Sequence, residues 1–299
     1  MSGPDHGNDY YHHEFDAFLR TTLAQCCHRP DGSAPPLLAK SIEYSLLAPG
    51  KRIRARLLLN CAEMLDLPRT YALHPAAALE MIHCSSLIHD DLPCMDNDDF
   101  RRGQPSNHVK FGEATALLAG DALIALAVEV FLHGPIYDSP ANQTLGLKRL
   151  VAALGPRGMI GGQAAELALG PSASVNELKA VHSQKTGALF SAALLIPKDL
   201  KGIPDESREG KAIHAFAYEL GLAFQLADDL EDEQSEKKKM KDQQSPSSSN
   251  ILYYVPRQEA VQCTLDNLLS SLQQLTDIWG KQAAPLNKIA SEVTKRLAH

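Results

Sequence analysis

The sequence of 299 residues contains few cysteines, and their spacing matches neither a zinc site nor a disulfide framework. The six cysteines are Cys26, Cys27, Cys61, Cys84, Cys94 and Cys263. Zinc sites pair ligands about two to four residues apart, and disulfide scaffolds need a higher cysteine density. The N-terminal segment MSGPDHGNDYYHHEF also lacks the apolar core of a secretory signal. These absences favour reduced cysteines and a cytoplasmic location.

Long apolar runs and a basic stripe are also missing. No stretch reaches the roughly 18 consecutive apolar residues of a membrane span, so the sequence predicts none. The formal net charge is -7, and Lys and Arg gather in only one short run. Nucleic-acid-binding domains usually present a basic face, so we expect no nucleic-acid partner. A lipid-like ligand would have to bind inside a cavity of the protein.

Alternation of apolar and polar residues, which is typical of half-buried strands, is almost absent. Apolar residues recur instead at spacings of three and four between proline and glycine breaks, and 44% hydrophobic residues can bury one large core. The sequence therefore predicts an all-α protein with one domain over residues 1–299 and a polar, mobile loop at about 233–250. The expected helices span about 9–28, 35–47, 52–66, 75–91, 113–133, 141–154, 157–169, 174–195, 207–231, 256–278 and 283–297.

Acidic side chains are concentrated in two places. Five fall between Asp90 and Asp99 after an apolar segment, and a second cluster from Asp228 to Asp232 follows another. Acidic runs are most often solvated faces, but negative charge is disfavoured near helix C-terminal ends, where both clusters are expected. A hard divalent ion such as Mg²⁺ would offset the repulsion and share its ligands with phosphate oxygens. The two clusters suggest a diphosphate held between metal ions.

The local geometry of each cluster can be anticipated. Pro93 should end the preceding helix and turn the chain, so that Asp96 comes back toward Asp90. In the second cluster, Gln225 lies three residues before Asp228, and Asp232 lies four residues after it, so all three share one face of a helix. They are expected to line one wall of a cavity, although Gln225 alone could equally be a polar core residue.

Basic residues occur in three short segments that could bind anions. GKRIR at 50–54 begins a helix, RRG at 101–103 follows the first acidic cluster, and KTG at 185–187 interrupts a helical pattern. Lysine is a point charge and arginine a planar fork, so the mixture suits phosphate oxygens approached from several directions. Each segment taken alone would more often be exposed surface charge.

Together these motifs resemble those of short-chain trans-isoprenyl diphosphate synthases, the farnesyl and geranylgeranyl diphosphate synthase family, over residues 35–233. The motifs are GKRIR at 50–54, His83, the run from Ser86 to Gly103, Asn107-His108 with Gly112-Glu113, Gly120-Asp121-Ala122-Leu123, Gly161-Gly162-Gln163, Lys185-Thr186-Gly187, and Phe224-Gln225 before Asp228-Asp229. The resemblance implies the isoprenoid synthase fold, a single helical bundle around a central cavity. It also implies a homodimer and three Mg²⁺ ions with diphosphate bound.

The reaction that the resemblance implies is Mg²⁺-dependent head-to-tail prenyl transfer in isoprenoid biosynthesis. Isopentenyl diphosphate would condense with dimethylallyl, geranyl or farnesyl diphosphate to give farnesyl or geranylgeranyl diphosphate. Stabilising the departing diphosphate lowers the barrier to an allylic cation. The implied metal ligands are Asp90, Asp96 and Asp228. The implied substrate-binding residues are Lys51, Arg54, His83, Arg101, Arg102, Lys185 and Lys237. The implied catalytic residues, whose oxygens would face the cation, are Lys185, Thr186 and Gln225.

Product length in this family depends on the residues just before the first aspartate, which are Ser85 and Ser86 here. Enzymes that stop at fifteen carbons often carry a bulky aromatic residue at the position of Ser85. A serine there predicts a deeper cavity, and we expect a twenty-carbon product.

The chain departs from the family pattern after Asp232. The family has two lysines in this loop, whereas here Lys237 matches the first and Ser247 replaces the second. One alternative is therefore a non-catalytic subunit that binds an active synthase. A class I terpene cyclase is a further alternative, but a cyclase would not need residues such as Lys51 and Arg54 for a second diphosphate.

Overall fold

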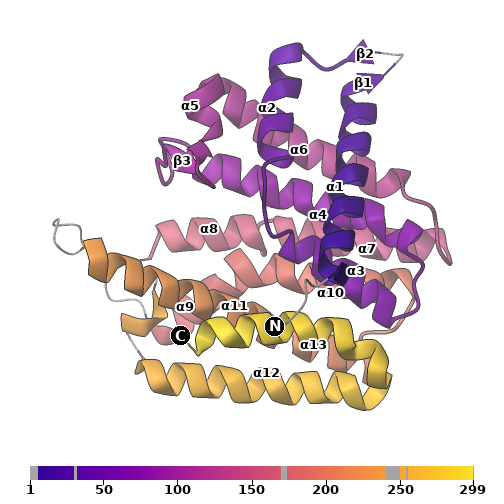
Figure 1. Cartoon of the computed structure of the whole chain (residues 1–299), viewed down its shortest axis with the longest axis vertical. Coiled ribbons are helices and arrows are strands. Elements are labelled where there is room, and N and C mark those ends of the chain that lie inside the picture. The colour runs from indigo at the N-terminus through magenta and orange to yellow at the C-terminus, as the bar shows by residue number, and fades with distance from the viewer. Residues whose placement is uncertain (1–5, 30–31, 170–173, 240–249, 254, 299) are drawn as a thin grey trace. The chain divides into compact units, whose positions relative to one another are not determined.

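The computed structural model describes residues 6–29, 32–169, 174–239, 250–253 and 255–298, and leaves undescribed the side chains of 6–12, 28–29, 232–239 and 253 (Figure 1). Its contacts divide the chain into two compact units. Unit 1 contains residues 1–59 and 68–136, and unit 2 contains residues 60–67 and 137–299. The prediction of a single domain over the whole chain stays a prediction.

Unit 1 is built from helices around the long helix α4. Its helices are α1 (His6–Cys27), α2 (Pro36–Leu46), the first part of α3 (Ile53–Met64), α4 (Arg69–Asp90), α5 (Asn107–Phe111) and α6 (Glu113–His133). Helix α4 packs along α6 and also contacts α1 and α2. Ala76, Ala77 and Ala78 are fully buried on α4, because small side chains allow neighbouring helices to approach closely.

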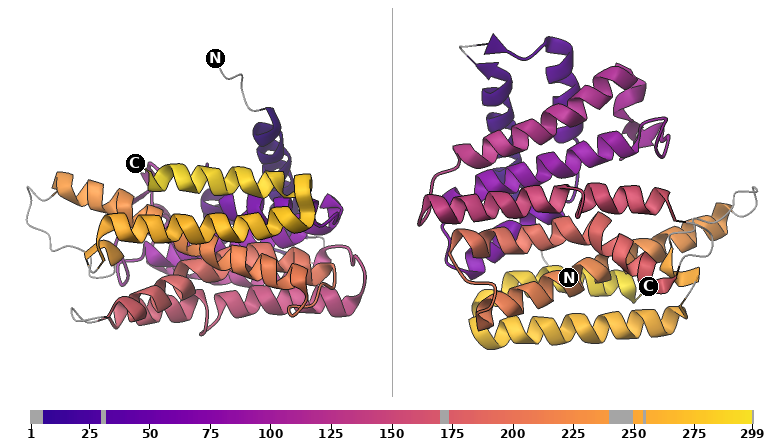
Figure 2. Two further views of the ribbon diagram at one scale, coloured as in Figure 1. Left: turned by 90° about the horizontal axis from the view of Figure 1, so that it is seen from below. Right: turned by 180° about the vertical axis from the view of Figure 1, so that it is seen from behind.

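Unit 2 is also helical. Its elements are α7 (Pro140–Leu154), α8 (Met159–Leu167), α9 (Val175–His182), the π-helical segment η1 (Ser183–Gly187), α10 (Ala188–Leu200), α11 (Arg208–Lys239), the 3₁₀ turns η2 (Ile251–Tyr253) and η3 (Gly280–Ala283), α12 (Arg257–Trp279) and α13 (Ala284–Leu297). Helix α11 contacts α10, α12 and α13, and α12 and α13 lie side by side in both views of Figure 2.

The all-α prediction is confirmed. In the part of the chain that the structure describes, strands form only two short antiparallel hairpins. These hairpins pair β1 (His28–Arg29) with β2 (Gly32–Ser33), and β3 (Phe100–Arg101) with β4 (Gln104–Pro105).

Several helix boundaries differ from the prediction, and local chemistry explains the differences. Helix α4 begins at Arg69 and contains Pro75, and α10 continues through Pro197 to Leu200, because tertiary packing offsets the local cost of a proline. Helix α11 continues past the expected end at 231 to Lys239, since Glu, Gln and Lys are good helix formers. The remainder of the predicted mobile loop, 240–249, lies outside the described residues.

A buried ionic network joins α7, α10 and the segment before α11 inside unit 2. The Lys198 ammonium, 2% exposed, contacts Asp199 at 2.8 Å and Asp205 at 2.5 Å. The Arg149 guanidinium donates to Asp199 at 2.9 Å and to Asp205 at 3.2 Å, and His214 Nε2 lies 2.9 Å from Asp205. Hydrogen bonds from Lys198 and His214 hold the pKa of Asp205 far below its usual range. Each buried charge is thus paired, as the low dielectric of an interior requires.

Candidate active site

The first acidic cluster lies in a tight turn at the end of α4, which ends at Asp90. The Asp96 backbone N–H donates to the Asp90 carbonyl at 2.8 Å, and the Asn97 N–H donates to the Leu92 carbonyl at 3.1 Å. Asn97 adopts a left-handed conformation with φ of 53°, which turns the chain back on itself. The predicted return of Asp96 toward Asp90 is confirmed.

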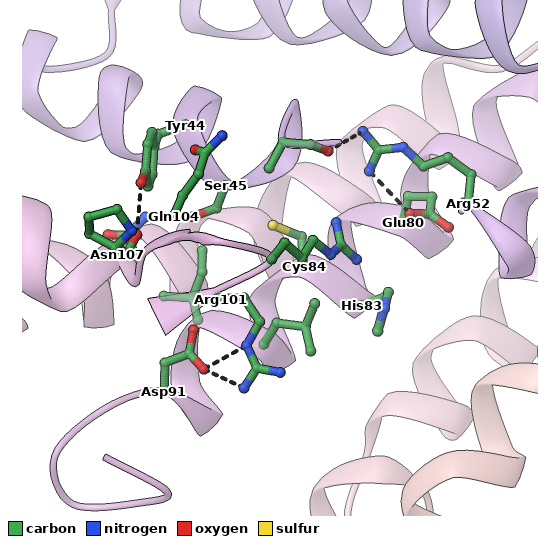
Figure 3. A pocket seen from close by; sticks show the side chains of 15 residues that line it. Tyr44, Ser45, Arg52, Glu80, His83, Cys84, Asp91, Arg101, Gln104 and Asn107 are labelled. Carbon is green, nitrogen blue, oxygen red and sulfur yellow. Dashed lines mark hydrogen bonds and ion pairs between the residues drawn. The ribbon is translucent and has the colours of Figure 1, made fainter. Parts of the chain in front are cut away.

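Asp91, the second residue of the cluster, is buried inside unit 1. Its carboxylate is almost fully buried and accepts from Arg101 Nε at 2.8 Å and Arg101 Nη2 at 2.5 Å (Figure 3). Arg101 stands on the β3–β4 hairpin and also contacts Asp98 at 3.3 Å. Burial raises the pKa of Asp91, and the Arg101 hydrogen bond opposes that rise. The pair therefore fixes the hairpin against the end of α4.

An arginine cluster surrounds His83 on α4. Arg54 Nη1 lies 3.2 Å from His83 Nε2. Burial lowers the pKa of His83 well below 6.5, and the charges of Arg54, Arg102, Arg52 and Arg101 lower it further. His83 is therefore neutral at physiological pH, and its ring nitrogen accepts from Arg54. Arg52 and Arg101 also pair with the carboxylates of Glu80 and Asp91, and an anion would be favoured beside the remaining positive charge of Arg54 and Arg102.

His83, Arg101 and Arg102 line a pocket of unit 1 that encloses about 510 Å³, including its opening to solvent (Figure 3). The Arg102 guanidinium donates to the Pro49 carbonyl at 3.3 Å. It fits there because residue 50 is glycine: a Cβ at Gly50 would lie 2.7 Å from Arg102 Nη1. The GKRIR and RRG segments, separated by about fifty residues in the sequence, thus meet in one site.

Arg52 of the GKRIR segment has a structural role. Its buried guanidinium contacts Glu80 at 3.5 Å (Figure 3). It also contacts Asp16 at 3.1 Å and donates to the carbonyls of Leu46 and Ala48. These contacts fix the segment between α2 and α3. Lys51, next to it, is exposed.

The two predicted chain-length residues lie on α4 one turn before Asp90. Ser85 is buried at 1% exposure, and the Ser86 hydroxyl donates to the His83 carbonyl at 2.9 Å. Neither lines the pocket that His83 lines.

The second acidic cluster lies on α11 in unit 2. Gln225 Nε2 donates to Asp229 Oδ1 at 2.9 Å, so its amide is held by Asp229. The Ile251 N–H donates to Asp229 Oδ2 at 3.1 Å, and the Asn250 side chain donates to the Asp229 carbonyl at 2.8 Å. Burial raises the pKa of Asp229, while His182, Gln225 and the Ile251 N–H oppose the rise. Asp229 therefore anchors the segment at residues 250–251 to α11.

Asp228 on the same helix contacts the C-terminal helix. Arg296 of α13 donates to Asp228 Oδ1 at 2.5 Å and to Glu231 Oε1 at 2.7 Å. Its guanidinium carbon also lies 4.7 Å from the centre of the Phe224 ring. Sequence reasoning missed Arg296, because nothing near it in the sequence marks it as a partner of residues 68 and 65 positions earlier.

Lys185 and Thr186 lie in the π-helical segment η1 between α9 and α10, which confirms the predicted interruption of the helix. The Lys185 ammonium forms an ion pair with Glu166 of α8. Gly162 allows α8 to approach this closely, since a Cβ there would lie 2.3 Å from the Lys185 backbone nitrogen. Sequence reasoning missed Glu166, whose signal is that it is the one charged residue of α8. The side chain of Lys237 lies outside the described residues, as does Ser247.

The chemistry of the donors suits a hard divalent cation. Asp90, Asp96 and Asp228 offer carboxylate oxygens without thiol or imidazole ligands, which fits Mg²⁺ better than zinc. Over the described residues, no three acidic, histidine or cysteine side chains already surround one point. A bound ion would complete its coordination with water and ligand oxygens, as Mg²⁺ usually does.

Comparison with known proteins identifies the family. Residues 35–277 match the family model described as polyprenyl synthetase. The chain belongs to the polyprenyl synthetase family. It is 41% identical over 239 residues to a farnesyl diphosphate synthase of Geobacillus stearothermophilus, and the match covers 79% of each chain. It is 43% identical over 202 residues to geranylgeranyl pyrophosphate synthase 7 of Arabidopsis thaliana, described as chloroplastic, covering 66% of this chain and 57% of that one.

Solved structures of polyprenyl synthetase relatives share the fold. A geranyltransferase of Legionella pneumophila superposes with a TM-score of 0.85 at 31% identity, covering 98% of this chain and 96% of that one. A geranyltransferase of Helicobacter pylori gives 0.81 at 29% identity, covering 98% and 99%. The predicted isoprenoid synthase fold and the trans-prenyltransferase class are confirmed. The comparisons support neither the terpene cyclase nor the partner-subunit alternative.

Proposed function

We propose that this polyprenyl synthetase condenses isopentenyl diphosphate with dimethylallyl, geranyl or farnesyl diphosphate to give a fifteen- or twenty-carbon product, with Mg²⁺ as its metal. The observation that supports this most directly is that unit 1 carries two separate features for anions. One is the Asp90–Asp96 turn, which suits metal-bound diphosphate, and the other is the arginine cluster around His83. A reaction that uses two prenyl diphosphate substrates needs both anion-binding features, whereas a cyclase, which uses one, needs only the metal-binding turn.

The side chains have distinct roles in this proposal. Asp90, Asp96 and Asp228 would hold Mg²⁺, which when bound supplies positive charge to the leaving diphosphate. Lys51, Arg54, His83 and Arg102 bind isopentenyl diphosphate, and the lowered pKa of His83 keeps its ring neutral until an anion arrives.

Further residues act on the allylic diphosphate and its cation. Arg101 and Lys185 donate to the departing diphosphate, each held in position by an acidic neighbour, Asp91 or Glu166. Lys237 adds charge to the same group. The oxygens of Lys185, Thr186 and Gln225 stabilise the cation. The π-helical geometry of η1 supports this role for Lys185 and Thr186, because π-helical turns depart from the α-helical hydrogen-bond pattern and are frequent at functional sites.

The chain-length proposal concerns Ser85 and its neighbour Ser86. A small buried side chain at Ser85 favours a deep cavity and therefore a twenty-carbon product. Ser85→Tyr should shorten the product, and an unchanged product after that substitution would defeat the assignment.

A homodimer is the proposed assembly. Helix α6 is long and apolar enough by composition to cross a membrane, the one such helix in the described parts of the chain. It packs against α2, α4 and α5, yet Leu117, Leu118 and Leu132 remain about half exposed. Exposed leucines along one helix are typical of protein interfaces, so Leu118→Glu should convert a dimer into a monomer in light-scattering chromatography. A cytoplasmic location stays a proposal from the sequence.

The deciding experiment is incubation of the purified full-length protein with Mg²⁺, labelled isopentenyl diphosphate and, separately, five-, ten- and fifteen-carbon allylic diphosphates. Products are then sized by chromatography. A prenyl diphosphate longer by five-carbon steps supports the proposal, and its length decides between fifteen and twenty carbons. Cyclic hydrocarbon without added isopentenyl diphosphate would favour a cyclase. No product alone, but altered product length when a synthase relative is added, would favour the partner subunit.

A further inference from the structure

Arg296 bridges two carboxylates of the second acidic cluster inside unit 2. Its Nη2 lies 2.5 Å from Asp228 Oδ1 and its Nε lies 2.7 Å from Glu231 Oε1. Asp228 and Glu231 are three residues apart on α11, so their side chains stand on one face of the helix. One planar guanidinium spans both oxygens, which a lysine ammonium could not do with the same geometry.

The position of Arg296 is fixed by more than charge. The guanidinium carbon lies 4.7 Å from the centre of the Phe224 ring, and Phe224 is one helical turn before Asp228. Arginine stacks favourably on aromatic faces. Arg296 also falls in the last turn of α13, where a cation is favoured by the helix dipole. Burial lowers the pKa of Arg296, but the hydrogen bonds and charges of Glu231 and Asp228 together outweigh burial and raise it, so Arg296 stays charged at any physiological pH.

We propose that Arg296 is the resident counter-cation of the second acidic cluster and that it competes with a divalent metal ion for Asp228. The inference rests on the proposed role of Asp228 as a metal ligand. The Arg296 guanidinium occupies Asp228 Oδ1 and repels a second cation on the same carboxylate, so Arg296 and a metal ion compete for Asp228. Binding of metal and opening of the Arg296–Asp228 pair are then one linked equilibrium.

The competition gives Arg296 two opposite effects. Without metal, the ion pair relieves repulsion between Asp228 and Glu231 and joins α13 to α11, so it stabilises the fold. With metal present, the guanidinium repels the ion and occupies one oxygen of Asp228, so it weakens metal binding. Because Asp228 and Glu231 are partly exposed, solvent screens the pair, and we expect an effect of about threefold on metal affinity.

The test measures Mn²⁺ binding by electron paramagnetic resonance of the free ion, without any substrate. The parent protein is the full chain with Asp90→Asn and Asp96→Asn, so that Mn²⁺ binding at the second acidic cluster dominates the resonance signal. Arg296→Gln in this background should bind Mn²⁺ about threefold more tightly than its parent. The matched control is Lys295→Gln, which removes the same charge from the exposed neighbouring residue on α13 and should leave the affinity unchanged. Arg296→Lys should fall between the parent and Arg296→Gln.

Thermal unfolding gives a second, independent measurement. Arg296→Gln should unfold at a lower temperature than its parent in EDTA, and saturating Mn²⁺ should remove most of the difference, since metal binds the folded state and replaces the lost cation. If the parent binds Mn²⁺ and Arg296→Gln binds it equally or more weakly, the proposed competition between Arg296 and the metal is wrong, while Asp228 stays a metal ligand. Binding that survives Asp228→Asn, or no binding in any variant, would overturn the metal assignment of Asp228 itself.

Discussion

Gly162 determines how closely α8 approaches the segment that carries Lys185 and Thr186, and its substitution gives a sharp prediction. A Cβ on Gly162 would lie 2.3 Å from the Lys185 nitrogen, 2.7 Å from the Lys185 Cα and 2.8 Å from the Gln184 carbonyl carbon. Unbonded carbon contacts are normally about 3.5–4.0 Å. All three contacts are with backbone, which cannot rotate away as a side chain can. Gly162→Ala must therefore separate α8 from η1 by about 1 Å.

That separation should affect both the reaction rate and the stability of the Gly162→Ala protein. A displacement of about 1 Å at groups that act on the substrate costs on the order of 100-fold in rate. Overpacking costs about 1–3 kcal/mol of stability, and the better helix propensity of alanine offsets about 1 kcal/mol of that. We thus expect Gly162→Ala to stay folded while its kcat for product formation falls about 100-fold.

The control is Gly187→Ala in the same π-helical segment. A Cβ at Gly187 meets nothing closer than 3.7 Å, and its φ of −63° suits any residue. This variant should keep wild-type kcat within about twofold and gain slightly in stability. Both variants are measured by labelled isopentenyl diphosphate incorporation and by urea unfolding. If Gly162→Ala and Gly187→Ala show the same kcat, then the close approach of α8 does not position Lys185 and the reasoning fails.

Three further predictions concern stability, pH and metal. Lys198→Met should lower the free energy of unfolding in urea by about 2–3 kcal/mol. This loss is smaller than the roughly 3–5 kcal/mol expected for a fully broken buried ion pair, because Arg149 still neutralises Asp199. The exposed control is Lys211→Met, and an equal loss of stability in both variants would contradict the prediction. Because the folded pKa of His83 lies well below its ordinary 6.5, only the unfolded chain takes up this proton as pH falls below 6.5. Stability should therefore decline with falling pH from that point, and His83→Gln should flatten the decline in urea titrations between about pH 7 and pH 5; identical slopes would refute the assignment. Asp90→Asn should weaken Mn²⁺ binding to the full chain in calorimetry by about tenfold or more with an unchanged unfolding midpoint, whereas unaltered affinity would remove Asp90 from the metal ligands.

Much of the fold and part of the site could be read from the sequence, because local chemistry encodes them. Spacings of three and four predicted helices, and proline after Asp90 and Asp91 predicted the turn that brings Asp96 back. The polar residues KTG predicted an interruption where η1 lies. Boundaries at Pro75 and Pro197 were wrong, because a proline's local cost is overridden when the rest of the helix is buried.

The sequence by itself thus determined which residue types are available and where several helices end or are interrupted. Only the tertiary structure decided which charges meet. Asp91 binds Arg101, Lys185 binds Glu166, and Asp228 binds Arg296, although the sequence around these residues does not indicate which acidic residue pairs with which basic residue. The physical reason is that an ion pair depends on distances between segments far apart in the chain. Those distances are set by helix packing, as at Gly162, and no local pattern of residues encodes them.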